Sequence, residues 1–134
     1  MSATKRSLLW VMALAYAAAG FNHLLNPQFY VAIMPPGLPD PAWLNVLSGL
    51  AEIVLAVFLL EPRTRILAAW GIIALLVAVF PANVYVAMNN VGIDGPGSGA
   101  GGLNWVRLPF QAVFVVWAWW YTQPEDETPR PDIP

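Results

Sequence analysis

The sequence has no cysteine and only one histidine among its 134 residues. The absence of cysteine excludes disulfide bonds, thiolate metal ligands and thiol catalysis. One histidine leaves too few ligands for a zinc site, which takes three or four protein ligands. We therefore expect no metal site and no intrinsic cofactor. Redox chemistry would depend on a molecule that the chain binds, and the sequence leaves open whether the chain is an enzyme.

Charge is also scarce, since charged residues make up 10% of the chain and the net charge is −2. Such a chain offers no basic surface for nucleic acid. By contrast, hydrophobic residues make up 58%, well above the usage of soluble domains. Four apolar stretches are close to the roughly 20 residues that cross a bilayer, and they cover residues 8–25, 42–60, 66–88 and 103–122.

This pattern predicts an all-α fold, a transmembrane four-helix bundle in a single membrane domain over residues 1–122. The last residues, 123–134, are rich in proline and acids and are predicted to form a disordered acidic tail. Basic residues flank the first span and the turn between the second and third spans, at Lys5, Arg6, Arg63 and Arg65. Because basic loops stay on the cytoplasmic side, we expect a multi-pass protein of the inner (cytoplasmic) membrane with both termini cytoplasmic.

The connection after the first span has its own helix signal. Asn26 followed by Pro27 is typical of a helix start, and Pro35 and Pro36 end the segment. We expect a short helix here, lying in the outer membrane interface.

Polar residues inside the spans are the candidates for a site. A charge at mid-helix costs about 2.5–3.5 kcal/mol on insertion scales, so such residues rarely face lipid. When the spans are aligned by topology, the polar residues fall in the outer half of the membrane, on stripes that also carry small residues. We predict that six of them line one cavity: Asn22, His23, Glu52, Asn83, Arg107 and Gln111. The alternative is structural, with Glu52 and Arg107 forming a buried ion pair and the amides linking helices.

The chain resembles the DoxX-like family of small four-helix membrane proteins over about residues 13–122. The resemblance rests on the segments "AGFNHLLNPQFYVAIMPPGLP", "SGLAE" and "FPAN", and on "RLP" followed by Gln111. It implies that the six polar positions and four prolines, Pro35, Pro36, Pro81 and Pro109, match the family motif. It also implies an association with redox complexes, because the family is named for a subunit linked to a thiosulfate:quinone oxidoreductase.

A histidine and a carboxylate under apolar walls suit a small polar head group on an apolar body. We therefore expect a quinone- or lipid-binding accessory subunit of a membrane redox system, with bound quinone, membrane lipid and a redox partner subunit as partners. A homo-oligomer is compatible with the sequence. Two other interpretations remain open, a small-solute or proton transport module and a purely structural membrane partner.

Overall fold

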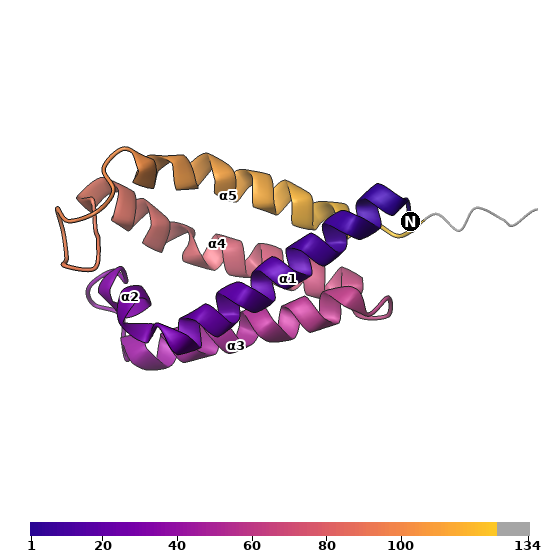
Figure 1. Ribbon diagram of the computed structural model, residues 1–134, viewed down its shortest axis with the longest axis horizontal. Coiled ribbons are helices and arrows are strands. Elements are labelled where there is room, and N and C mark those ends of the chain that lie inside the picture. Colours follow the sequence, from indigo (N-terminus) through magenta and orange to yellow (C-terminus); the bar gives the residue numbers. More distant parts are fainter. Residues whose placement is uncertain (126–134) are drawn as a thin grey trace, which may run out of the picture.

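The computed structural model describes residues 1–125, and every regular element in this part of the chain is a helix. The helices are α1 (Ala3–Leu25), α2 (Pro27–Ala32), α3 (Pro41–Leu60), α4 (Arg65–Asn89) and α5 (Leu103–Trp120) (Figure 1). Residues 126–134, which form most of the predicted acidic tail, lie outside the described residues.

Three of the helices, α1, α3 and α4, are long and apolar enough to cross a membrane. The chain is therefore an all-helical, membrane-spanning protein. Helix α5 covers the fourth predicted span, but it has 18 residues and carries Asn104, Arg107 and Gln111 in its first half, and it is not among these three. Helix α1 begins before the predicted span because Ser2 caps it, its hydroxyl accepting from the backbone N–H of Lys5 at 3.1 Å.

The long helices form two antiparallel pairs, α1 with α3 and α4 with α5, and the pairs are joined through α3 and α4. The pairs converge at the end that holds the N-terminus and the α3–α4 turn, and they separate toward the end that holds α2 (Figure 1). We name these the closed end and the open end. The buried core includes Leu9, Met12, Leu59, Ile72 and Tyr121, from both pairs. Packing at the closed end therefore holds the pairs together and leaves room at the open end.

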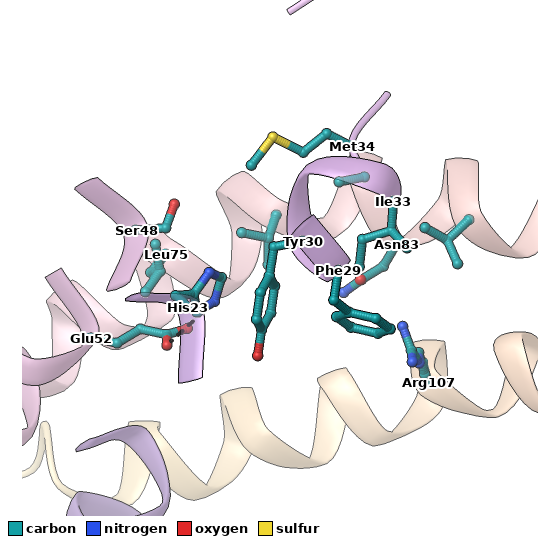
Figure 2. A pocket seen from close by; sticks show the side chains of 13 residues that line it. His23, Phe29, Tyr30, Ile33, Met34, Ser48, Glu52, Leu75, Asn83 and Arg107 are labelled. Carbon is teal, nitrogen blue, oxygen red and sulfur yellow. Dashed lines mark ion pairs between the residues drawn. The ribbon is translucent and has the colours of Figure 1, made fainter. Parts of the chain in front are cut away.

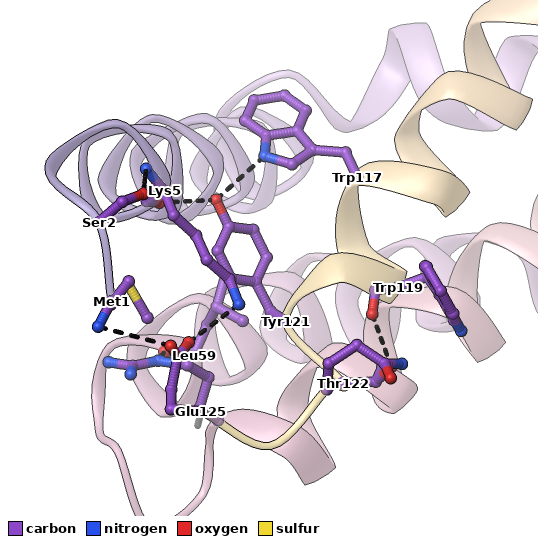
Figure 3. Close-up of polar contacts among 11 residues, drawn as sticks. Met1, Ser2, Lys5, Leu59, Trp117, Trp119, Tyr121, Thr122 and Glu125 are labelled. Carbon is purple, nitrogen blue, oxygen red and sulfur yellow. Dashed lines mark hydrogen bonds and ion pairs between the residues drawn. The ribbon is translucent and has the colours of Figure 1, made fainter. Parts of the chain in front are cut away.

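Polar contacts fix the chain ends at the closed end (Figure 3). The buried Lys5 ammonium lies 2.9 Å from the Glu125 carboxylate, and the N-terminus lies 3.5 Å from the other oxygen of that carboxylate. Tyr121 donates its hydroxyl hydrogen to the backbone oxygen of Lys5 at 3.0 Å, and Trp117 donates to the Tyr121 oxygen at 3.3 Å. We name Met1, Lys5, Tyr121 and Glu125 the terminal clasp, which ties the start of α1 to the segment after α5.

Two glycines set the crossing of α1 and α3. A Cβ atom at Gly20 would lie 2.5 Å from the backbone oxygen of Gly49, and a Cβ at Gly49 would lie 2.8 Å from the backbone oxygen of Gly20. Small residues of this kind let helix backbones approach closely in membranes. The approach brings His23, one turn after Gly20, against the face of α3 that carries Asn45.

Candidate functional site

A cavity of about 340 Å³ lies toward the open end, between the two helix pairs (Figure 2). All five helices contribute to its walls, and the segment after α2 adds Ile33 and Met34. Most of the lining is apolar, and its polar or aromatic members are His23, Phe29, Tyr30, Ser48, Glu52, Asn83 and Arg107. This volume falls in the range of small-molecule sites, and so does the combination of apolar walls with a few polar groups.

Asn45 fixes the tautomer of His23. The amide nitrogen of Asn45 donates to the backbone oxygen of His23 at 2.7 Å, and a carbonyl oxygen can only accept. The amide oxygen of Asn45 is therefore the atom 2.7 Å from His23 Nδ1, so Nδ1 must carry a hydrogen and donate it. Because Asn45 is fully buried, no water competes for this arrangement. In neutral His23 the other ring nitrogen, Nε2, is left with a free lone pair.

Nε2 of His23 faces Glu52. It lies 3.6 Å from Glu52 Oε2, within ion-pair range but longer than a hydrogen bond. The two side chains are only 14% and 16% exposed, and Oε2 is buried without a hydrogen-bond partner among the described residues. The carboxyl group therefore meets the cavity through its other oxygen. In neutral His23 the Nε2 lone pair and the carboxylate oxygen are both acceptors, so neither can donate a hydrogen bond to the other.

Helix α2 covers this pair with an aromatic ring. Tyr30 stacks on His23 with ring centroids 3.7 Å apart and an interplanar angle of 21°. Its hydroxyl oxygen accepts from the side-chain amide of Asn22 at 2.5 Å, and Asn22 in turn accepts from Asn26 at 2.6 Å. Asn26 stands at the cap position of α2, but its side chain makes this bond instead of a capping bond. The chain of amides thus anchors Tyr30 over His23.

Asn83 and Gln111 join α4 to α5. Asn83 donates its amide hydrogen to the Gln111 side-chain oxygen at 2.7 Å, and the Gln111 amide donates to the backbone oxygen of Leu76, about one turn before Pro81. Asn83 also lines the cavity, whereas Gln111 is buried and borders a separate, smaller one. The two amides therefore hold the wall of the cavity together next to the proline in α4.

Arg107 lies at the edge of the cavity. Its side chain is exposed and, in Figure 2, points toward the ring of Phe29. The Glu52–Arg107 ion pair of the structural alternative is not formed, since no ion pair among the described residues includes Arg107 and Glu52 faces His23 instead. The guanidinium is thus free to meet a ligand or a lipid head group at the cavity mouth.

Four of the six predicted site residues line the cavity: His23, Glu52, Asn83 and Arg107. Asn22 and Gln111 do not, and they hold Tyr30 and Asn83 in place. The predicted site omitted Phe29, Tyr30 and Ser48, which line the cavity, and Asn45, which positions His23. Asn45 lies two helical turns before Glu52 on the same stripe, a spacing that could have included it. Tyr30 gives no comparable signal, because aromatic residues are common at membrane interfaces.

The residues at hand suit acid–base chemistry and hydrogen bonding. Residues 1–125 hold no group of three histidine or acidic side chains that could share a metal ion.

A family model described as "Domain of unknown function (DUF8561)" matches residues 12–122, which include the whole cavity lining. No curated protein and no solved structure matches the chain.

Proposed function

The chain belongs to this domain family of unknown function, so its role rests on the site, and we propose that it binds a lipid-soluble molecule with a polar head group. Quinones are the class that fits best. One observation carries the proposal: the His23–Glu52 pair, with Nε2 3.6 Å from Oε2, stands in the wall of a mainly apolar cavity. A quinone ring is flat and apolar, and its carbonyl oxygens need hydrogen-bond donors.

In this role the chain is an accessory subunit of a membrane redox system. A protonated member of the pair could donate a proton to a quinone oxygen, and a deprotonated member could take one up from a quinol. Tyr30 and Phe29 offer rings for stacking. The chain has no cysteine and so no thiol pair that could take up two electrons. The electrons would come from a redox partner subunit, as the resemblance to DoxX-like proteins also suggests.

We propose further that α5 is a fourth span and that α2 lies in the outer interface of the inner membrane. In support, α5 runs antiparallel beside α4. The basic residues Lys5, Arg6, Arg63 and Arg65 gather at the closed end, which this topology puts in the cytoplasm. The cavity then opens toward the outer face.

Mass spectrometry of the purified protein tests the quinone proposal. Wild-type protein extracted in mild detergent should retain quinone, and Glu52→Gln or His23→Ala should release most of it. Glu61→Gln is the matched control, because it makes the same change at an exposed turn away from the cavity. Wild-type protein that carries no quinone and binds none when supplied would overturn the proposal.

One observation favours a second candidate, proton or small-solute transport: Glu52 borders a second, deeper cavity as well as the first. A carboxyl group between two cavities can pass a proton from one to the other. Purified protein in liposomes should then carry a proton flux that Glu52→Ala abolishes and Glu61→Ala leaves intact. Equal proton flux in liposomes with and without the protein would exclude this role.

A further inference from the structure

The deeper cavity has a volume of about 300 Å³ and lies between the helix pairs. Residues from the four long helices line it: Ala15, Tyr16, Ala19, Glu52, Leu75, Leu76, Val79 and Phe114. Apart from Glu52 and the Tyr16 hydroxyl, these side chains are apolar. Quinone binding as proposed above does not use this space.

The two cavities adjoin at Glu52. Glu52, Leu75 and Val79 line both of them, whereas His23, Asn83 and Arg107 line only the outer one. Polar groups thus lie on one side of Glu52 and apolar walls on the other. A molecule that occupied both cavities would need a polar head at one end and a hydrocarbon portion at the other.

The deeper cavity borders the gap between α1 and α5. These two helices make no close backbone contact with each other in the described part of the chain. Ala15 on α1 and Phe114 on α5 line the cavity and are both exposed at their surfaces. In a bilayer, exposed apolar side chains of a membrane-spanning helix meet lipid acyl chains. The α1–α5 side of the deeper cavity therefore faces lipid in a bilayer.

We infer that the deeper cavity receives the hydrocarbon chain of the ligand, which is a single-chain amphiphile that enters sideways between α1 and α5. Its head lies at His23 and Glu52, and its chain lies against Ala15, Ala19 and Phe114. This inference rests on the proposed function and names the ligand class more narrowly. Because the chain passes from lipid into an apolar cavity, van der Waals contact with the cavity walls stabilises the bound chain, and the walls select a chain by its fit.

Filling the deeper cavity tests the inference. The probes are 2,3-dimethoxy-5-methylbenzoquinone without a tail and the same ring with a decyl tail, each titrated into protein in nanodiscs. Ala19→Phe should weaken binding of the tailed probe about tenfold or more and change binding of the tailless probe less than about twofold. Ala18→Phe is the matched control, since Ala18 is exposed on α1 and does not line the cavity. Comparing variant with wild type for each probe removes the effect of partitioning into lipid.

Equal losses for the two probes, or no loss with Ala19→Phe, would overturn the inference and leave the quinone proposal standing. A wild-type protein that binds neither probe would instead overturn the quinone proposal. Photolabelling of the wild-type protein is a second test of the inference. It uses no variant, so a folding defect cannot affect the result. A hexadecanol with a diazirine at the end of its chain should label Tyr16, which is half-buried and lines the deeper cavity. Labelling confined to the exposed groove at Trp119 and Trp120 would refute the inference.

Discussion

At the scale of single residues, Asn45 determines which ring nitrogen of neutral His23 carries the hydrogen, although Asn45 does not line the cavity. The backbone oxygen of His23 forces the Asn45 amide nitrogen toward itself, and this orientation leaves only the amide oxygen for Nδ1. Asn45 is therefore a positioning residue, and the pair formed by His23 and Glu52 depends on it.

Replacing Asn45 with leucine should change the tautomer of His23. Without the amide, Nδ1 loses its acceptor and the backbone oxygen of His23 loses its donor, a cost of about 1–3 kcal/mol in unfolding free energy for unsatisfied buried groups. Nitrogen-15 spectra of labelled histidine report the tautomer, and the single histidine gives one unambiguous signal. Wild-type protein in its neutral form should show a hydrogen on Nδ1. A wild-type spectrum dominated by hydrogen on Nε2 would contradict the assignment.

At the scale of elements, the contact of Gly20 with Gly49 aligns α1 with α3. Both helices were predictable from apolar runs and proline boundaries, and so was the side of α3 that carries Glu52. The side chain that pairs with Glu52 was not predictable, because Arg107 and His23 both lie at membrane depths from which they could reach Glu52. The choice depends on how α1 and α3 rotate about their crossing. A close approach of two glycines sets that rotation, and one sequence does not say which glycines meet.

Substitution of Gly49 by alanine should separate α1 from α3. The new Cβ would lie 2.8 Å from the Gly20 backbone oxygen and 2.8 Å from the Cβ of His23, so a helix must move. Overpacking of this kind costs about 1–3 kcal/mol. Thermal unfolding in detergent should show a lower Tm, and the quinone content should fall with it.

Gly71→Ala is the control for this substitution. Its Cβ would meet only the flexible end of Leu55, at 2.6 Å, and alanine favours a helix interior by about 0.5–1 kcal/mol over glycine. The Tm should stay unchanged or rise. Similar losses for the two variants would show that the Gly20–Gly49 crossing has no special role.

At the scale of the whole molecule, the terminal clasp makes stability depend on pH. The hydrogen bond from Lys5, aided by the charges of Lys5 and the N-terminus, lowers the pKa of Glu125 below its ordinary value. A carboxyl group with a lowered pKa stabilises the fold above the pKa of the unfolded chain, about 4.3 for glutamate. That stabilisation is lost as the pH falls through the lower pKa of the folded state.

The Tm should therefore fall as the pH is lowered below about 4.3, and Glu125→Gln should make this fall shallower. The variant should also have a lower Tm at pH 7, because Lys5 is buried and loses its counter-ion. Glu61→Gln, which removes an acid outside the clasp, should leave the pH profile intact. Identical profiles for wild type and Glu125→Gln would show that the clasp contributes nothing.

Topology is tested most directly through the absence of native cysteine. Single cysteines at Ser98, Arg63 and Gln123 all lie at exposed positions. With four spans, a membrane-impermeant maleimide should label position 98 in intact cells and positions 63 and 123 only after permeabilisation. Labelling of position 123 from the outside would show that α5 does not cross the membrane.

The splayed arrangement of the helix pairs also has a mechanical consequence. Helix α4 has 25 residues and is thus roughly 37 Å long at about 1.5 Å per residue. The pairs are joined at the closed end. If one pair rotates by about 5° about this end, the far end of a helix of this length moves by about 3 Å. A displacement of this size is about the width of a water molecule. A rotation of one pair against the other at the closed end would therefore widen or narrow the mouth of the cavity.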